Sequence, residues 1–285
     1  MPHALRRPTL LLLTLALVGS TLLAASLGGS SNAAPSGAAN VGAGPRMDHI
    51  PSPNQVVHYP TNAGTVFGWG KPKWGDEFEV GGLRGDWVNS KQGRVKTQSG
   101  MLTLQATGPN YRVTTSANSV KARYGRWEAR VRIRETSHDG RQYRGYWELI
   151  PTGAFKCGAK SIVLSSYRRG DRRATGAVRV PEKTQYSFSK KVALHNGWFH
   201  TYAVEITKDH ISWFVDTKVI HTERRDDALR GIEYRPRFRL QGVKGEKHRT
   251  TWLQMDWVRH YDLARPNAKS IKAPRMRKGV YRDPC

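Results

Sequence analysis

The stretch "RYGRWEARVRIRE" (residues 123–135) decides the fold of this 285-residue chain. Its apolar side chains Trp127, Ala129, Val131 and Ile133 alternate with charged residues. Such a two-residue period puts one set of side chains on each face of a β-strand, whereas a helix would scatter both sets around its axis. The stretch therefore predicts a strand with one face in a hydrophobic core and the other face in water.

Similar alternation, or a short run of β-branched and aromatic residues, recurs along the chain between clusters of Gly, Asn, Asp and Pro. Many short strands without a long helical pattern predict an all-β protein, a sandwich or jelly roll of two antiparallel sheets. One short helical turn is expected in "DDALRGIEY" (residues 226–234). The other predicted strands are "MLTLQA" (101–106), "YRVTT" (111–115), "HTYAVEIT" (200–207), "HISWFVD" (210–216), "RFRLQGV" (237–243) and "WLQMDWVRHYD" (252–262).

The amino-terminal end has the pattern of an export signal. Arg6 and Arg7 precede an apolar run over residues 9–27, and Ser31 and Ala33 occupy the small-residue positions before a cleavage site. Small and polar residues interrupt the run, which is short for a full membrane span. We therefore expect a secreted protein, with wall association open and no membrane span left after cleavage.

Composition divides the chain into four parts. Residues 1–33 are the expected signal peptide, and residues 34–66, rich in Ala, Gly, Pro, Ser and Asn, predict a flexible linker or arm. Residues 67–263 contain the strand patterns and predict one domain. Residues 264–285 contain seven Lys or Arg and one Asp, and predict a basic carboxyl-terminal tail.

The overall charge is strongly positive. Forty-seven Lys and Arg stand against 22 Asp and Glu, which gives a formal net charge of +25. Nucleic acid is not the expected partner of an exported protein, so the candidates are acidic polysaccharides, anionic cell-wall polymers and lipid headgroups. A basic surface that serves only solubility is the alternative.

The chain contains two cysteines, Cys157 and Cys285. Export permits a disulfide between them. Such a bond would close a long loop and stabilise the fold by about 2 to 5 kcal/mol, because it restricts the unfolded chain. The alternative is a buried Cys157 and a free terminal thiol, and the sequence leaves both open.

Several common catalytic motifs do not occur in the sequence. It contains no phosphate loop, dinucleotide fingerprint, paired-histidine zinc motif or Gly-x-Ser-x-Gly elbow. The ten histidines are scattered without a recognised ligand spacing. Nucleotide-dependent and zinc-dependent chemistry are therefore not indicated.

Five phrases, in order, resemble glycoside hydrolase family 16, which includes laminarinases, lichenases and carrageenases. The resemblance spans about residues 69–262 and implies a concanavalin A-like β-jelly roll with a glycan cleft on its concave face. It leaves a structural calcium ion open and implies no other cofactor. The phrases are "WGDEFEVGGLRGDWV" (74–88), "YGRWEARVRI" (124–133), "GYWELIP" (145–151), "WFHTYAVEITKDHISWFVDTKVIH" (198–221) and "MDWVRHYD" (255–262).

Enzymes of this family carry their catalytic acids on one strand, as Glu-x-Asp-x-x-Glu or as the shorter Glu-x-Asp-x-Glu. Retaining hydrolysis needs two carboxyl groups about 5 Å apart, one as nucleophile and one as acid and base. The longer form, laid on "SIVLSSY" (161–167), puts Ser161 at the nucleophile, Val163 at the middle Asp and Ser166 at the acid/base, while the shorter form ends at Ser165. Neither register contains a carboxylate, so the resemblance implies a family framework without its catalytic acids.

Two acids near this strand are candidates for a displaced catalytic pair. Glu148 precedes the strand and Asp171 follows it. The alternative for Glu148 is a charge paired with a neighbouring arginine, and the alternative for Asp171 is a turn residue.

Other residues near the same strand are candidates for glycan binding. Tyr143, Tyr146 and Trp147 lie on or near the strand that would border the cleft, and flat aromatic faces suit sugar rings. Arg144 and Arg168 are candidates to meet sulfate, phosphate or carboxylate groups, because a guanidinium forms two-pronged hydrogen bonds with such anions.

The sequence therefore supports three hypotheses. The leading one is an exported, non-hydrolytic protein that binds a polysaccharide, with acidic polysaccharides among the candidates. The first alternative is an active endo-acting β-glycan hydrolase with displaced carboxylates, and the second is a wall-associated structural protein held by its basic tail. The sequence does not name the glycan, its linkage or the oligomeric state.

Overall fold

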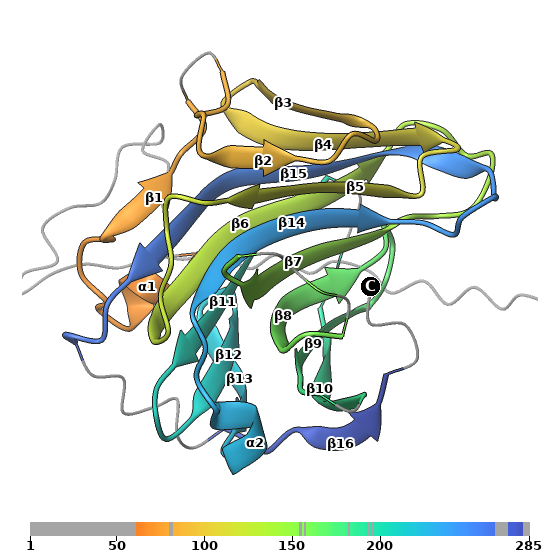
Figure 1. The fold of residues 1–285 in the computed structure, drawn as a ribbon. Coiled ribbons are helices and arrows are strands. Elements are labelled where there is room, and N and C mark those ends of the chain that lie inside the picture. The colour runs from red at the N-terminus through yellow and green to blue at the C-terminus, as the bar shows by residue number, and fades with distance from the viewer. Residues whose placement is uncertain are drawn as a thin grey trace, which may run out of the picture. The chain divides into compact units, whose positions relative to one another are not determined.

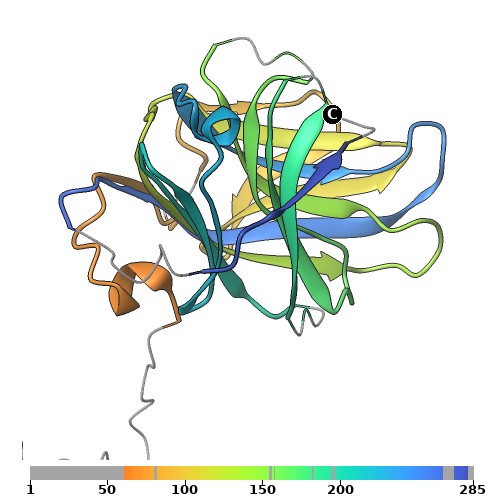
Figure 2. The ribbon, with the colours of Figure 1, turned by 90° about the horizontal axis from the view of Figure 1, so that it is seen from below.

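The computed structural model describes residues 61–79, 82–153, 156, 158–181, 183–192, 194, 197–265 and 273–281. These residues belong to one compact unit that spans Val57–Cys285. The unit consists of two antiparallel sheets packed face to face (Figures 1 and 2). The prediction of an all-β sandwich is confirmed.

The first sheet, which we call sheet A, has the strand order β13-β12-β11-β6-β15-β4-β3, with β1 paired to β15 off this path. Its long strands β6 and β15 cross the middle of the sandwich (Figure 1). The strands are β1 (Trp74–Asp76), β3 (Arg94–Gln98), β4 (Met101–Gly108), β6 (Gly125–Glu135), β11 (His200–Ile206), β12 (Ile211–Val215), β13 (Lys218–Glu223) and β15 (His248–Tyr261).

The second sheet, sheet B, has the order β16-β10-β9-β8-β7-β14-β5-β2. Every neighbouring pair in it is antiparallel, and β16, from the carboxyl-terminal end of the chain, forms one edge. The strands are β2 (Trp87–Asn89), β5 (Arg112–Ala117), β7 (Arg144–Pro151), β8 (Ser161–Tyr167), β9 (Arg173–Arg179), β10 (Thr184–Lys191), β14 (Tyr234–Gln241) and β16 (Arg277–Val280).

Helices are short in the described part of the chain. The expected turn in residues 226–234 is confirmed as α2 (Asp226–Leu229), and α1 (Ala63–Val66) lies in the segment expected to be a linker. None of the described helices is both long and apolar enough to cross a bilayer. The segment expected to be a basic tail contributes β16, so at least part of it is a strand of the sheet.

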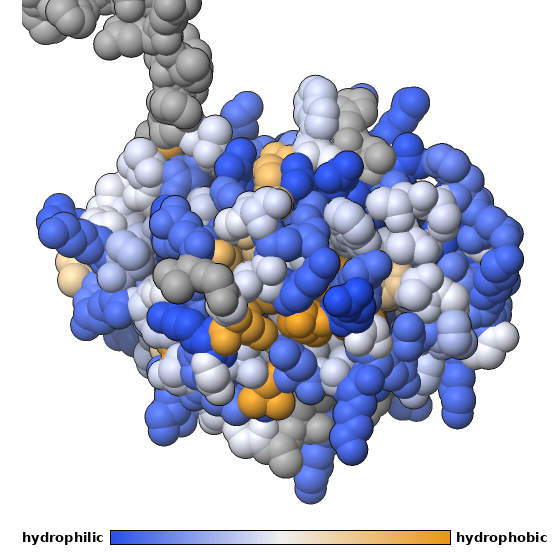
Figure 3. All heavy atoms as spheres, turned by 90° about the horizontal axis from the view of Figure 1, so that it is seen from above, coloured by the Kyte–Doolittle hydropathy of each residue, from blue (hydrophilic) through white to orange (hydrophobic). Residues whose placement is uncertain are grey.

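The strand predicted from residues 123–135 is β6, and its apolar face behaves as expected. Trp127, Ala129, Val131 and Ile133 are all buried between the sheets. Each large apolar side chain removed from water contributes roughly 1.5 to 3 kcal/mol, so this face of β6 is a major part of the core. The outer surface is mostly hydrophilic when seen from above, with small apolar areas (Figure 3).

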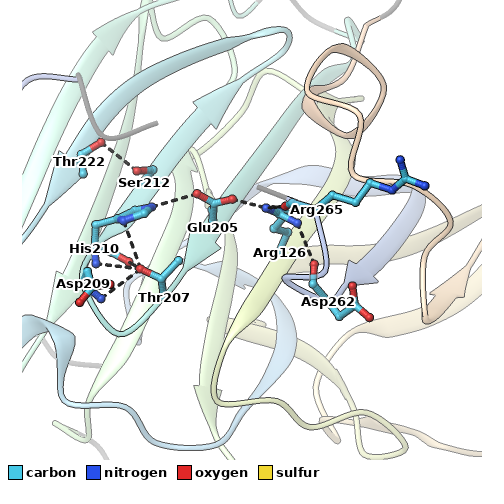
Figure 4. Close-up of polar contacts among 9 residues, drawn as sticks. All are labelled: Arg126, Glu205, Thr207, Asp209, His210, Ser212, Thr222, Asp262 and Arg265. Carbon is cyan, nitrogen blue, oxygen red and sulfur yellow. Dashed lines mark hydrogen bonds and ion pairs between the residues drawn. The ribbon is translucent and has the colours of Figure 1, made fainter. Parts of the chain in front are cut away.

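The opposite face of β6 was predicted to lie in water, and at the first residues of the strand this prediction is wrong. The Arg126 guanidinium is buried, with an ion pair of 2.6 Å from its Nε to the Glu205 carboxylate. It also donates hydrogen bonds to the backbone carbonyls of Asp262 and Arg265, and the other Glu205 oxygen contacts His210 (Figure 4). A charged residue is buried here because the chain after β15 returns over this end of sheet A.

Glu128, two residues further along β6, is covered by the segment that contains α1. The backbone N–H groups of Ala63 and Gly64 donate to its Oε1 at 2.7 and 3.2 Å, and the Asn62 amide donates to its Oε2 at 3.1 Å. The side chain is completely buried. Burial raises the pKa of Glu128 to about 7, and these hydrogen bonds offset only part of that effect.

Glu128 predicts a dependence of stability on pH. Its folded-state pKa lies above the ordinary value of 4.5, so the folded chain holds a proton that the unfolded chain releases. This contribution to the free energy of unfolding is present below about pH 4.5 and is lost as the pH rises to about 7, by on the order of 3 kcal/mol. Glu128→Gln cannot ionise and is expected to lack this loss.

The measurement is urea unfolding of the wild type and Glu128→Gln at pH 4.5, 6 and 8. The stability of the wild type relative to the variant should fall across this range. Glu233→Gln, at an exposed ion pair with Lys121, is the control and should show no such trend. A wild-type-to-variant difference that is constant with pH would show that Glu128 titrates normally.

Candidate functional site

The centre of sheet B contains an irregularity in β8. Glu148 of β7 lies opposite Val163, but the preceding residue, Trp147, lies opposite Ser165, so Leu164 has no partner on this side. The pairing of β8 with β9 shifts at the same place, between Val163 and Ser166. An extra residue of this kind is a β-bulge, and it changes which side chains share a face.

The bulge decides between the two family spacings. Val163 and Ser166 lie opposite Glu148 and Tyr146, which are two residues apart on β7 and so share one face. Ser161 lies opposite Arg179, which lines the same face of sheet B. The longer spacing, Ser161-x-Val163-x-x-Ser166, is therefore the one that occupies a single face.

The residues skipped by this spacing point into the sandwich. Leu164 belongs to the hydrophobic core, and Ser165 is buried opposite the core residue Trp147. The Val163 carbonyl accepts a hydrogen bond of 3.0 Å from the indole Nε1 of Trp213, on β12 of the other sheet. Trp213 thus satisfies a backbone group at the bulge and holds the two sheets in register there.

The outer face of sheet B is hollowed around β8, β9 and β10. A cavity of about 660 Å³ lies over these strands and extends to the edge formed by β16. We call it the arginine cleft. It is lined by Arg144, Tyr146, Val163, Ser166, Arg173, Thr175, Gly176, Ala177, Arg179, Gln185, Ser187, Phe188, Ser189, His221, Arg275 and Arg277.

The described residues that line the arginine cleft include positively charged side chains and no negatively charged ones. Five arginines line it, and no Asp or Glu is among the described residues that do so. His221 stacks on Phe188, with 5.0 Å between ring centroids, and burial lowers its pKa from 6.5, which favours the neutral imidazole. The positive charge of the cleft therefore comes from guanidinium groups, which stay protonated at every physiological pH.

Two of these arginines already hold other groups of the protein. Arg144 donates to the Ser166 hydroxyl at 3.2 Å, and Arg173 donates to the Ser189 hydroxyl and carbonyl at 2.7 and 2.8 Å. These hydrogen bonds orient the guanidinium groups but do not neutralise them, because a hydroxyl and a carbonyl carry no net charge. Arg144 also forms a longer ion pair, of 3.8 Å, with the Asp171 carboxylate.

Glu148 is on the same face but is not available to a substrate. Its side chain is fully buried, and Arg237 and Arg239 of β14 contact its Oε1 at 2.8 and 2.9 Å. Burial alone would raise its pKa, but the two guanidinium groups outweigh burial and lower the pKa of Glu148 to about 2. A carboxyl group that is ionised throughout the ordinary pH range and held by two arginines cannot serve as a general acid.

Asp171 does not complete a catalytic pair with Glu148. It lies in the turn after β8, where it accepts a hydrogen bond of 2.8 Å from the Arg168 backbone N–H. Its Oδ2 also lies 3.8 Å from the Arg144 guanidinium, so the carboxylate is held by the turn and by an ion pair. The turn and ion-pair alternatives therefore describe these acids.

The predicted glycan-binding residues fall into two groups. Tyr143 and Trp147 are fully buried in the core, so the prediction that they bind a glycan is wrong. Tyr143 stacks on His248, and the Trp147 indole donates to the Tyr202 carbonyl at 3.2 Å. Both side chains point inward because they occupy the alternate positions of their segment, the positions whose side chains face the core.

The other three candidates are on the outer side of sheet B or at its rim. Tyr146 and Arg144 line the arginine cleft, and the Arg239 guanidinium covers one face of the Tyr146 ring at 3.9 Å. Arg168 lies in the turn after β8 and is not among the cleft-lining residues. The binding roles of Tyr146, Arg144 and Arg168 remain predictions.

Sequence reasoning did not single out Arg173, Arg179 or Arg277 as cleft residues. The alternation in "RATGAVR" (residues 173–179) carried a usable signal, because it places Arg173 and Arg179 on one face of a strand. Arg277 gave no such signal, because its position depends on the pairing of β16 with a strand some 90 residues earlier.

Two further predictions concern a disulfide and calcium. Cys157 and Cys285 lie outside the described residues. Calcium takes six to eight oxygen ligands, and no three His, Cys, Asp or Glu side chains gather as a metal site in the described part of the chain.

The fold and this face define the class of protein: a two-sheet β-sandwich with a polar, arginine-lined cleft on one sheet. The model of the family "Glycosyl hydrolases family 16" matches residues 169–258, about a third of the chain. A comparison with curated proteins gives no match.

Solved structures of laminarinases share the fold. The laminarinase from Rhodothermus marinus is 18% identical over 67% of this chain and 97% of its own, with a TM-score of 0.56. The catalytic domain of an endo-1,3-β-glucanase (laminarinase) from Thermotoga petrophila is 13% identical over 67% and 97%, also with a TM-score of 0.56.

A third structure is a Glu-to-Ser mutant of SCLam, a non-specific endo-β-1,3(4)-glucanase from family GH16. It was co-crystallised with 1,3-β-D-cellobiosyl-cellobiose and presents 1,3-β-D-cellobiosyl-glucose at its active site. It is 16% identical over 67% of this chain and 94% of its own, with a TM-score of 0.55. The resemblance to glycoside hydrolase family 16 and the jelly-roll fold are therefore confirmed.

The ion pairs of Glu148 predict the effect of removing its charge. Glu148→Gln leaves Arg237 and Arg239 buried without a counter-charge and is expected to lower the free energy of unfolding by about 3 kcal/mol or more. The wild-type carboxylate stabilises the fold above about pH 4.5, and this stability is lost as the pH falls towards about 2. Glu148→Gln should lack that acid-dependent loss.

Urea unfolding followed by tryptophan fluorescence at pH 7 and pH 3 measures both effects. Glu77→Gln, which removes a carboxylate from an exposed ion pair with Arg259, is the control and should change stability by less than about 1 kcal/mol. If Glu148→Gln were as stable as the wild type at pH 7, Glu148 would not be the counter-charge of the two arginines.

Proposed function

We propose that this chain is an exported protein that binds an acidic polysaccharide in the arginine cleft and does not hydrolyse it. One observation carries the proposal: the cleft over β8 is lined by five arginines and by no carboxylate among its described residues. Hydrolysis of a glycosidic bond by the usual mechanism needs two carboxyl groups. Binding of an anionic glycan needs cationic donors, and the cleft supplies these.

The strand β8 supports the non-hydrolytic part of the proposal. By the family resemblance, Ser161, Val163 and Ser166 occupy the positions of the catalytic acids, and the bulge places all three on one face. A serine hydroxyl has a pKa far above neutral and needs a neighbouring base to act as a nucleophile. The described groups nearest to the Ser166 hydroxyl include the Arg144 guanidinium, which favours an oxyanion but accepts no proton.

The SCLam mutant supports the compatibility of serine with binding. In that glucanase a serine stands in place of a glutamate, and a trisaccharide is present at the active site. A serine in place of a glutamate is therefore consistent with a cleft that keeps its ligand.

The charge of the cleft supports an acidic ligand. Two-pronged guanidinium hydrogen bonds suit sulfate, phosphate and carboxylate groups, and each charge-assisted bond contributes about 1.5 to 3 kcal/mol when shielded from water. A neutral glucan offers hydroxyl groups only and supplies no counter-charge to the arginines of the cleft. Export is supported by the amino-terminal pattern alone, which lies outside the described residues.

The proposal predicts binding without cleavage. Purified protein should migrate more slowly in native gels that contain carrageenan than in gels that contain laminarin. It should release no reducing ends from laminarin, lichenan, carrageenan or agarose. Because surface charges are screened by salt, the retardation by carrageenan should decrease between 50 and 500 mM NaCl.

Arg144→Gln and Arg94→Gln form a matched pair for this experiment. Arg144 lines the cleft, whereas Arg94 is an exposed residue of β3 on the other sheet. The first substitution should weaken binding of carrageenan roughly tenfold, and the second should leave it nearly unchanged. Release of reducing ends that disappears in a folded Glu148→Gln variant would contradict the proposal and favour a hydrolase with displaced carboxylates.

A further inference from the structure

The carboxyl-terminal segment forms one wall of the arginine cleft. β16 pairs antiparallel with β10, and Arg277 lies opposite Ser187 while Lys278 lies opposite Tyr186. Ser187 lines the cleft, whereas Tyr186 is buried in the core. Because side chains directly opposite each other in a sheet share a face, Arg277 is on the cleft side and Lys278 on the other side.

Contacts at both ends of β16 hold it in this position. Before the strand, the Pro274 carbonyl accepts a hydrogen bond of 2.9 Å from the Thr222 backbone N–H of β13. After the strand, the buried Tyr281 hydroxyl donates to the Val180 carbonyl at 3.2 Å. Met276, next to Arg277, is buried in the core. β16 is therefore an integral edge of sheet B, and the direction of the Arg277 side chain is fixed by the sheet.

The two arginines of this segment carry positive charge that the acidic residues in the described part of the chain compensate only in part. Arg275 lies 3.7 Å from the Glu223 carboxylate, but Arg225 contacts the same carboxylate at 2.7 Å. One negative charge between two guanidinium groups leaves a net positive charge. Arg277 is exposed, and among the described residues no acidic side chain lies within ion-pair distance of it.

The cleft face has a charge pattern that a polymer can follow. The row of outward-facing residues through the bulge runs from Arg277 through Ser187, Ala177, Val163 and Glu148 to Arg237. Its interior is small or apolar, apart from Glu148, which two arginines neutralise. Arg277 therefore provides a cationic group at one end of a floor that is close to neutral, and Arg237 at the other end is paired with Glu148, across about five strand spacings of roughly 4.8 Å each.

We propose that β16 makes the carboxyl-terminal segment the element that selects charged over neutral polysaccharides. Arg277, with Arg275 beside it, binds an anionic substituent, a sulfate ester or a carboxylate, on a chain that lies in the arginine cleft. This inference rests on the proposed function and extends it, because it assigns the charge preference to a segment outside the matched family region of residues 169–258.

The test compares Arg277→Gln with Lys278→Gln in the full chain. Both substitutions remove one positive charge from adjacent exposed residues of β16, but only Arg277 faces the cleft. Binding to carrageenan, to chemically desulfated carrageenan and to alginate is measured by isothermal titration calorimetry at 50 mM NaCl. Carrageenan and alginate separate a sulfate preference from a carboxylate preference.

For Arg277→Gln we expect a roughly fivefold loss of affinity for carrageenan, for alginate or for both, and no change for desulfated carrageenan. Lys278→Gln should bind each polymer within about a factor of two of the wild type. The selective loss should shrink at 500 mM NaCl, where charge interactions are screened. Equal thermal unfolding temperatures for the two variants would show that β16 remains paired.

The outcomes separate this inference from the proposed function. If the wild type bound none of the three polymers, the proposed function would be wrong. If the wild type preferred a charged polymer and the two variants lost affinity equally, the proposed function would stand and the role of Arg277 would be refuted. Equal losses for charged and desulfated carrageenan in Arg277→Gln would also refute the charge-selecting role.

Discussion

The hydrogen bond from the Trp213 indole to the Val163 carbonyl is the contact on which the layout of the cleft depends. It joins β12 of one sheet to the bulge in β8 of the other. Without the bulge, the strict two-residue period of a strand would turn Ser166 away from the face that holds Ser161 and Val163. The core of the sandwich thus determines which side chains the opposite surface presents.

Among the described residues, the one acid at the centre of that surface is held by ion pairs within the protein. Glu148 lies opposite Val163 but is buried between Arg237 and Arg239. Two guanidinium groups next to each other on one strand face would repel, and the carboxylate removes that repulsion. The arrangement leaves one net positive charge in the face. If the Glu148 carboxylate took up a proton, it would lose its charge, and the two buried guanidinium groups would repel each other. Glu148 therefore does not suit proton exchange with a substrate.

Much of the fold was predictable because the strands carry their own period. The core face of β6 and the order of the family phrases pointed to the sandwich, and Ser161, Val163 and Ser166 pointed to the changed strand. The bulge could not be chosen in advance, because its Val163 carbonyl is satisfied by a tryptophan about 50 residues away. Tyr143 and Trp147 were misassigned for a related reason: an aromatic residue suits a core as well as a sugar, and only the register of β7 assigns the face. The buried Arg126 and Glu128 likewise reflect segments that fold back over β6.

The proposed loss of hydrolysis and the proposed gain of charge selectivity are one electrostatic change. Carboxylates in a cleft weaken its binding of an acidic polysaccharide, because like charges in close contact are unfavourable. Replacing the acids by serine and valine removes the repulsion, and the arginines on β7, β9 and β16 add attraction. Specificity is a difference of affinities, so both steps act in the same direction. The neutral floor of β8 matters as much as the charged rim, because any acid there would compete with the glycan for the same guanidinium groups.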